Sequence, residues 1–194
     1  MMDSSFEAEF DAYMAGKRQW MKDTYNRVLP SGELIFNRFD KAEYLSMGKD
    51  SSVYDTSVVM GDVTVGEHVW IGPYTLLEGI NGKLTIGDWV SINAGVMIYT
   101  HDTTKKYLSG GIDEVVKGPV TIGDHTVIGT LSTVGCGVTI GDHCVVGAYS
   151  MVTGDIPPYS IAAGVPAKII GRVVEDEGHI RFEYFGGQPK ENAI

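Results

Sequence analysis

An aliphatic residue returns every six positions along most of this chain, and it is often followed by glycine. The segments read VYDTSV, VMGDVT, VGEHVW and IGPYTL, and later IGDHTV, IGTLST, VGCGVT and IGDHCV. A period of six fits neither an α-helix nor a heptad, but it fits the two-residue alternation of strands. Short strands that turn a corner every six residues form a coil, and coils stack at the ~4.8 Å spacing of paired strands. The fifteen lead residues are Met47, Val53, Val59, Val65, Ile71, Leu77, Ile86, Ile92, Ile98, Ile122, Ile128, Val134, Ile140, Val146 and Val152.

The tandem repeats and their closing stretch, GAYSMVTGDIPPYSIAAGVPAKIIG, resemble the hexapeptide-repeat acyltransferases over roughly residues 45–172. The resemblance implies an all-β fold, a left-handed parallel β-helix with three hexapeptides per coil, and a homotrimer that uses acyl-CoA. Its handedness comes from the resemblance alone, because chain chirality normally favours right-handed crossovers. A β-sandwich of short strands is the alternative, but sandwich strands would not keep phase over fifteen steps.

The ends of the chain lack the repeat, so we expect an N-terminal helical cap at 1–44, the β-helix at 45–172 and a tail at 173–194. One helix, or two helices with a break near Gly16, is predicted for residues 4–28, where apolar residues recur at helical spacing. Ser4 and Glu7 form a capping box at its start, and Pro30 ends it. This helix is expected to lie against the first coil and hide its open end. In the tail, HIRFEYF is expected to form a strand or to pack on a neighbour.

The composition excludes some partners and compartments. A net charge of −10 argues against nucleic acid, which needs a basic patch. No stretch approaches the ~18–20 apolar residues of a membrane span, and the acidic N-terminus lacks the order of a secretion signal. The two cysteines, Cys136 and Cys144, are interpreted as reduced thiols, so we expect a cytoplasmic protein.

Three hexapeptides per coil assign the lead residues to three faces, and both breaks in the repeat then fall at one corner. Three residues are extra between Leu77 and Ile86, and eighteen are extra between Ile98 and Ile122. Both insertions follow a face-B strand in consecutive coils, so they should emerge one above the other. The eighteen residues could instead form one more coil, whose lead residues would be Thr104, Gly110 and Val116. Because only one of these three is apolar, we expect a loop at 99–119. Face A holds Val53, Ile71, Ile92, Ile128 and Val146; face B holds Val59, Leu77, Ile98, Val134 and Val152; face C holds Met47, Val65, Ile86, Ile122 and Ile140.

His101 lies at the root of the long loop, just past a rigid strand. Acyl transfer to a hydroxyl or amine needs a base at neutral pH, which suits an imidazole. In the resembled family a His in a comparable loop is the general base, and YTHDT looks like that element. Glu78, Asn81 and Asp102 gather at the same corner as candidate substrate-binding residues. Either Glu78, Asp102 or a backbone carbonyl could orient the ring; alternatively, His101 merely caps the loop with Asp102.

The donor site follows from the resemblance. Small residues on one corner would let a pantetheine arm run along the coil, and two cations would meet the CoA phosphates. One phosphate contact is in doubt, because Gly154 stands where family members often carry Lys. Packing alone is the other explanation for the small residues. The candidates are Gly129, Thr130, Gly147, Ala148, Ala162, Ala163, Lys168 and Arg172.

Three further histidines, His68, His125 and His143, each follow a face-C lead by three positions, with Trp89 in the equivalent place. They should stack along one edge, and a solvated turn position is the favoured interpretation. The metal alternative is a γ-carbonic-anhydrase-like zinc site, but the pattern of that family is not recognisable here, so we expect no metal.

The resemblance, together with the position of His101, implies an acetyl-CoA-dependent acyltransferase that acetylates a hydroxyl of a sugar or a polysaccharide precursor, with sites between subunits. The alternative within the class is N-acylation of an amino sugar carried on a nucleotide. A purely structural β-helix would be the third possibility.

Overall fold

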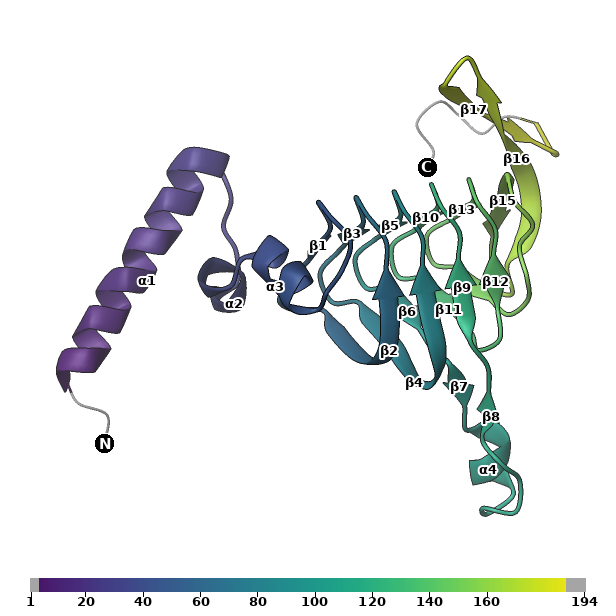
Figure 1. The fold of residues 1–194 in the computed structure, drawn as a ribbon, viewed down its shortest axis with the longest axis horizontal. Helices are drawn as coiled ribbons and strands as arrows, with labels where there is room; N and C mark the ends of the chain where they lie inside the picture. The colour runs from purple at the N-terminus through teal and green to yellow at the C-terminus, as the bar shows by residue number, and fades with distance from the viewer. Residues whose placement is uncertain (1–3, 188–194) are drawn as a thin grey trace.

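The body of the protein is a coil of short parallel strands, seen in a computed structural model that describes residues 4–187 (Figure 1). On face A, each lead residue is paired in register with the lead of the next coil, as Val53 with Ile71 and Ile71 with Ile92. The predicted assignment of this face is confirmed. Its strands are β1 (Ser52–Val53), β3 (Trp70–Ile71), β5 (Ser91–Ile92), β10 (Val127–Ile128), β13 (Val145–Val146) and β15 (Ser160–Ala163).

Faces B and C share one sheet, because β2 (Val58–Val65) and β4 (Leu76–Ile86) continue around the corner between them. Leu77 pairs with Ile98 on face B, and Ile86 pairs with Ile122 on face C. These registers match the predicted ladders. Face B continues with β6 (Met97–Ile98), β11 (Thr133–Val134) and β14 (Met151–Val152), and face C with β9 (Val120–Ile122) and β12 (Thr139–Ile140).

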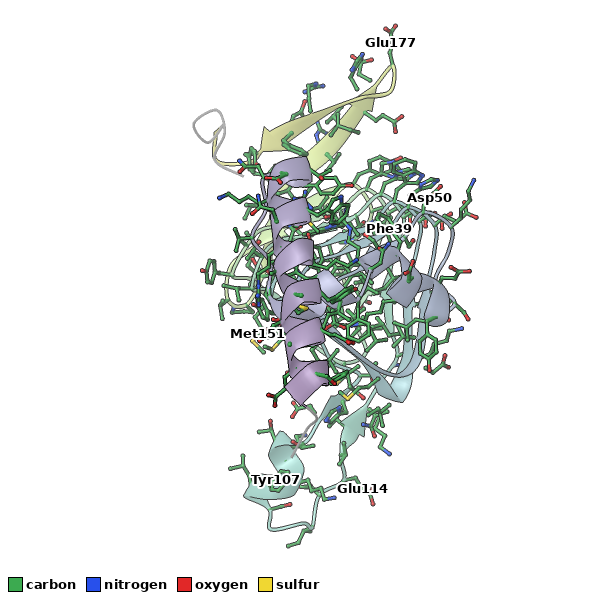
Figure 2. The ribbon with its side chains drawn as sticks, turned by 90° about the vertical axis from the view of Figure 1, so that its left-hand side faces the viewer. Phe39, Asp50, Tyr107, Glu114, Met151 and Glu177 are labelled. Atoms are coloured by element: carbon green, nitrogen blue, oxygen red, sulfur yellow. The ribbon has the colours of Figure 1, made fainter. Side chains whose placement is uncertain are left out.

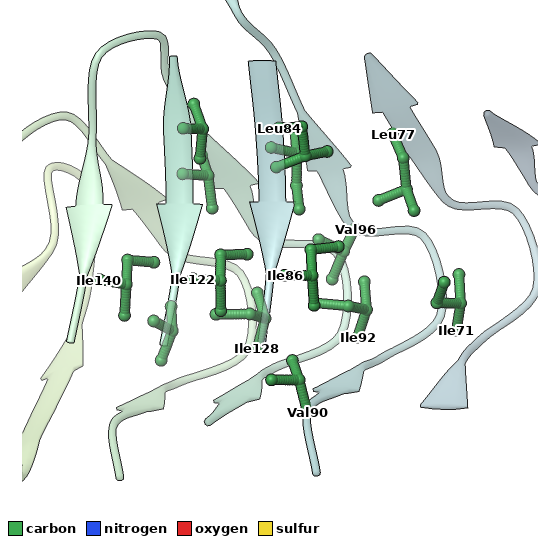
Figure 3. Close-up of a cluster of buried hydrophobic side chains, with 14 of the residues drawn as sticks. Ile71, Leu77, Leu84, Ile86, Val90, Ile92, Val96, Ile122, Ile128 and Ile140 are labelled. Carbon is green, nitrogen blue, oxygen red and sulfur yellow. The ribbon is translucent and has the colours of Figure 1, made fainter. Parts of the chain in front are cut away.

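The lead residues form the core. Thirteen of the fifteen are buried, and Met47 and Val59 pack partly buried against the same cluster. Figure 3 shows Ile86, Ile122 and Ile140 stacked in line across successive coils. Each buried isoleucine contributes roughly 2–3 kcal/mol by leaving water, so the repeat itself supplies the driving force for folding. The predicted class, a left-handed parallel β-helix with helices near the N-terminus, is confirmed.

Buried hydroxyls join neighbouring coils at the corners. Ser132 Oγ donates to the carbonyl of Gly147 (2.9 Å) and accepts from the N–H of Ser150 (3.1 Å). Thr126 Oγ1 bonds in the same way to Gly141 and Cys144. A buried hydroxyl without partners would be destabilising, so these bonds explain why small polar residues recur four positions after a lead.

The N-terminal segment forms one long helix and two short ones: α1 (Ser4–Tyr25), α2 (Ser31–Ile35) and α3 (Arg38–Tyr44). Helix α1 is unbroken at Gly16, but it stands away from the coils (Figure 1), so the prediction that it lies on the first coil is wrong. Helix α3 takes that place. Its Ala42 is buried in the core, and Lys41 Nζ donates to the carbonyls of Tyr54, Asp55 and Ser57 at 2.8–3.0 Å.

The C-terminal segment is a hairpin of β16 (Lys168–Asp176) and β17 (His179–Tyr184) that extends the sheet of face A. HIRFEYF therefore does form a strand. The predicted boundary after residue 172 falls within β16, and residues 188–194 of the predicted tail lie outside the described residues. Cys136 and Cys144 are free thiols, and burial raises the pKa of the Cys144 thiol.

No helix within residues 4–187 combines the length and the apolar character needed to cross a bilayer.

Candidate active site

The shorter insertion is a bulge in β4 at the corner between faces B and C. Between the pairs Gly61–Gly79 and Val63–Leu84, β2 has one residue and β4 has four, which accounts for the three extra residues. A bulge keeps the flanking ladders in register while pushing a few residues outward. The backbone after Glu78 is thereby lifted out of the coil.

The longer insertion leaves the same corner one coil later and projects from the body as an arm (Figures 1 and 2). Its base is a two-stranded antiparallel ladder of β7 (His101–Asp102) and β8 (Val116–Lys117), and α4 (Thr104–Leu108) lies beyond it. Figure 2 shows Tyr107 and Glu114 on the projecting part. The prediction of a loop instead of a seventh coil is confirmed.

The two insertions touch each other, as their shared corner predicts. The Asn81 N–H donates to Thr100 Oγ1 (3.2 Å). A Cβ on Gly82 would lie 2.9 Å from the backbone of Gly118, where the arm returns to the coil, so a larger residue would force the two segments apart. The bulge therefore supports the root of the arm.

Glu78 is buried between the insertions, with 2% of its surface exposed. Oε1 accepts from the N–H of Ile80 (2.7 Å). Oε2 accepts from the N–H and the hydroxyl of Thr100 (2.8 and 2.9 Å) and lies 2.9 Å from His101 Nδ1. A carboxylate so enclosed cannot bind an acceptor, so the predicted substrate contact of Glu78 is wrong; what remains is its alternative role of holding the imidazole.

The charge state of Glu78 fixes the tautomer of His101. Burial alone would raise the pKa of Glu78, but the hydrogen bonds from Thr100, His101 and Ile80 together lower it to about 2. At neutral pH the carboxylate can only accept, so His101 Nδ1 must carry the proton that it donates to Oε2. In the neutral ring the lone pair is then on the other nitrogen, Nε2, which is the atom that a general base would use.

His101 is held at the root of the arm and stays accessible, with 28% of its side chain exposed. The ring of Tyr99 meets it edge to face, with the centroids 6.2 Å apart. Thr100, the residue between them, is fully buried and supplies two of the bonds to Glu78. We did not single out Thr100 from the sequence, because nothing in a threonine at a strand end distinguishes a positioning role from a packing one.

Asp102 points to a different partner. Its Oδ1 accepts from the N–H of Thr104 (2.7 Å) at the start of α4, and hydrogen bonds from Thr104 lower the pKa of Asp102. Asp102 is exposed, and Glu78 occupies the bond to His101 Nδ1. Of the alternatives left open by the sequence, Glu78 and not Asp102 orients the imidazole.

Most of the candidate donor residues lie at the corner between faces A and B. A Cβ on Gly129 would lie 2.4 Å from the nitrogen of Ala148, and one on Gly147 would lie 2.9 Å from the Cβ of Ala163. The backbone of Thr130 accepts from the N–H of Tyr149 in the next coil. The small residues are thus stacked in line along the coil axis, as predicted.

Ala162 and the two cations are placed differently. Ala162 is a core residue in register with Val146, so its side chain cannot reach a ligand in a groove. Lys168, on β16, is exposed next to Ala163. Arg172 is paired with Glu183 through Nε at 2.5 Å, so its charge is already partly neutralised.

The three histidines that follow face-C leads stack as predicted along the corner between faces C and A. His68 lies on Trp89 with centroids 4.2 Å apart, and His143 lies between His125 (4.6 Å) and Tyr159 (4.7 Å). These rings pack face to face and do not converge on a point. Across residues 4–187 no group of three or more His, Cys, Asp or Glu side chains is arranged to hold a metal ion.

Comparison with known proteins decides the family. The pattern described as "Bacterial transferase hexapeptide (six repeats)" matches residues 115–154. Over 141 residues the chain is 33% identical to the galactoside O-acetyltransferase of Escherichia coli K12, a match that covers 62% of this chain and 68% of that protein. This chain belongs to the hexapeptide-repeat transferases.

Solved structures place the transferase among enzymes. It is similar to a hexapeptide-repeat acetyltransferase of Vibrio cholerae complexed with acetyl-CoA, with 28% identity, a TM-score of 0.62, and coverage of 85% of this chain and 89% of that one. It is also similar to an N-acyltransferase of Bacillus cereus in complex with dTDP and 3-hydroxybutyryl-CoA, with 27% identity, a TM-score of 0.59 and coverage of 64% and 70%. The transferase is an acyltransferase, as its repeats predicted.

Proposed function

We propose that this transferase moves an acetyl group from acetyl-CoA to a hydroxyl of a sugar or of a polysaccharide precursor, with His101 as the general base. The observation that carries the proposal is the 2.9 Å contact of His101 Nδ1 with the ionised, buried Glu78. In the neutral ring this contact puts the lone pair on Nε2, at an accessible corner. A relative that acetylates galactosides supports the choice of a sugar hydroxyl.

The reaction follows from the tautomer. Nε2 of His101 takes the proton of the acceptor hydroxyl as its oxygen attacks the thioester carbonyl, and the carbon–oxygen bond forms. The imidazolium that results is stabilised by the Glu78 carboxylate. Collapse of the tetrahedral intermediate breaks the carbon–sulfur bond, and the proton on Nε2 passes to the departing CoA thiolate. Asn81 and Asp102, on the bulge and at the root of the arm, are the proposed acceptor contacts.

Acetyl-CoA is the proposed donor, and the stacked corner of Gly129, Thr130, Gly147 and Ala148 is its proposed groove. The small side chains of these four residues, beside the larger Leu131 and Tyr149, would let the pantetheine amides reach backbone groups there. Ala163 continues the line, and Lys168 offers a free cation for a phosphate, with Arg172 as a second one if it exchanges Glu183 for the ligand. The structure of a similar acetyltransferase with acetyl-CoA supports the choice of donor.

A homotrimer with sites between subunits is proposed because the two halves of the site lie at different corners of one chain. Within its coil, His101 stands after the face-B strand, whereas Thr130 and Ala148 stand before the face-B strands of their own coils. The width of face B therefore separates His101 from these two residues. A neighbouring subunit would bring its donor corner to this His101. Apolar side chains exposed along face B support such a contact: Val58, Tyr74, Met97, Leu131, Tyr149 and Met151.

The second candidate is N-acylation of an amino sugar carried on a nucleotide. The similarity to an N-acyltransferase solved with dTDP favours it, and the same base could serve an amine. The two reactions differ in the bond formed, so the product distinguishes them.

The test measures acetyl-CoA consumption by the wild-type protein across matched sugars, amino sugars and nucleotide-linked amino sugars, with products identified by mass spectrometry. The proposal expects an O-acetylated sugar as the preferred product. An amide product formed at a much higher kcat/KM would replace it with the second candidate. A lack of turnover with every acceptor, although acetyl-CoA binds, would overturn the sugar assignment.

A further inference from the structure

Helix α1 presents a stripe of aromatic side chains that nothing within residues 4–187 covers. Phe6, Phe10, Tyr13 and Trp20 are each 44–56% exposed, and only Met14 of this helix is buried. Figure 1 shows α1 at the N-terminal end of the molecule, beyond α2 and α3 and apart from the coils. Four large aromatic side chains on one helix are an unusual amount of apolar surface to leave in water.

The charges of α1 are divided between its two halves. The first half carries Glu7, Glu9 and Asp11 and no basic residue, and the second half carries Lys17, Arg18 and Lys22 against Asp23. Two copies laid antiparallel would place acid against base along their length, whereas parallel copies would place like against like. The helix dipoles also oppose each other favourably in the antiparallel arrangement.

The spacing of four of these charges fits one register. Glu7, Asp11, Arg18 and Lys22 recur at intervals of four, seven and four, which keeps them on one side of the helix, beside the aromatic stripe. In an antiparallel pair, Glu7 of one copy would meet Lys22 of the other, and Asp11 would meet Arg18. All four side chains are exposed, and none is in an ion pair within the described chain.

A groove lies ready beside the second half of the helix. It has a volume of about 390 Å³ and runs between α1 and the α2–α3 segment. Lys17, Trp20 and Met21 line one side, and Phe36 and Phe39 line the other. In the same register, Phe6 and Phe10 of a second copy lie opposite this half of α1. Gly16, near the middle, has open space around it, so a neighbouring helix can approach closely there.

We propose that α1 is a self-association helix, which pairs antiparallel with α1 of a second copy of this chain across a twofold axis. The twofold makes the contact self-complementary, because each copy supplies both the acidic and the basic half. The pair joins two copies of the chain, each within its own proposed homotrimer, through their N-terminal ends. The arm that begins at His101 lies outside this contact. The inference stands on α1 alone and does not depend on the proposed reaction.

The experiment compares the mass of full-length variants by sedimentation equilibrium over a range of concentrations. The variant Glu7→Lys, Asp11→Lys sets base against base at both ends of the pair, so its mass should be half that of the wild type. Its dissociation constant should rise about tenfold or more. Adding Arg18→Glu and Lys22→Glu restores opposite charges and should restore the wild-type mass. Circular dichroism checks that α1 stays helical in each.

The control is Asp176→Lys, Glu177→Lys at the tip of the C-terminal hairpin, which makes the same change of net charge far from α1 (Figures 1 and 2). It should keep the wild-type mass. Acetyl transfer should be unchanged in all variants, so a loss of activity would bear on the proposed function instead. Equal masses for the wild type and the Glu7→Lys, Asp11→Lys variant would overturn the proposal and would mean that the stripe is covered within one assembly or by another protein.

Discussion

Glu78 and His101 are separated by 23 positions in the sequence but share a hydrogen bond, because both follow face-B strands in consecutive coils. Residues that are one coil apart in the sequence lie on neighbouring strands, which are about 4.8 Å apart. The carboxylate is ionised and enclosed before any substrate arrives. Its effect on the imidazole is therefore built into the folded state and needs no rearrangement during the reaction.

Replacing Glu78 tests its positioning role. In Glu78→Gln a neutral amide replaces the carboxylate, and one of its two ends can only donate, so the Nδ1 proton is held less firmly and kcat should fall by about 10²–10³-fold. Loss of the negative charge also disfavours the imidazolium, so the ascending limb of the pH–kcat profile should move to lower pH. Glu67→Gln, an exposed carboxylate at another corner, is the control. An unshifted profile would indicate that Glu78 serves only the fold.

The same carboxylate makes stability depend on pH. The pKa of Glu78 is about 2 in the folded state and about 4.5 in the unfolded state, so folding favours the ionised form. Its contribution, on the order of 3 kcal/mol, is complete above about pH 4.5 and is lost as the pH falls toward 2. Urea unfolding at pH 7 and at pH 2.5 should therefore show a smaller difference between wild type and Glu78→Gln at the lower pH. A difference that does not change with pH would contradict this account.

At the residue scale the sequence identified His101 because the repeat breaks beside it. It did not decide between Glu78 and Asp102, since that choice depends on the bulge that turns Glu78 inward beneath Thr100. It also assigned Ala162 to the donor groove. That position is the lead of a sixth coil, and its phase is hidden by the proline-rich stretch before it.

At the scale of elements, α3 closes the open end of the β-helix with a single lysine. Lys41 donates to three carbonyls of the first coil, and desolvation by burial lowers its pKa. These carbonyls have no further coil to pair with, so the ammonium replaces the missing strand. The cap therefore consists of this lysine and the buried Ala42 on a short helix, instead of a long helix laid on the coil.

Removal of this charge should destabilise the cap. Lys41→Met keeps the apolar stem but removes the ammonium from all three carbonyls, of which only that of Tyr54 keeps a donor among the described residues, the N–H of Ser57, so the free energy of unfolding should fall by about 2–4 kcal/mol. Thermal and urea unfolding measure it. Lys49→Met, at an exposed lysine in the same region, should change stability by less than about 0.5 kcal/mol. Equal effects of the two substitutions would show that the cap does not depend on Lys41.

The periodicity of the sequence predicted which strands and helices form better than it predicted where they pack. The six-residue phase placed the parallel ladders between residues 47 and 152, since one buried side chain per strand leaves a single workable register. Helical spacing also predicted α1. It could not show where α1 packs, because an apolar stripe indicates that a surface will be covered and does not say by what.

At the scale of the whole molecule, the donor corner and His101 lie on opposite sides of face B. Activity should therefore be recovered by mixing two inactive variants. His101→Asn keeps the donor corner, and Gly147→Trp, which adds bulk against Ala163, keeps the base. After the two variants are mixed in equal amounts, dissociated and reassembled, about a quarter of the shared sites should have both native halves. No recovery, with mixed assemblies confirmed by mass, would place each site within one subunit.

The most direct test of the account is kcat for His101→Asn with the preferred acceptor at saturating acetyl-CoA, beside the wild type. The account predicts a fall of about 10²–10⁴-fold with little change in the KM for acetyl-CoA, because the imidazole acts on the proton and not on the donor. Asn should leave the fold intact, since the side chain lies at an accessible corner. Full turnover by the folded variant would contradict the central claim that His101 is the base.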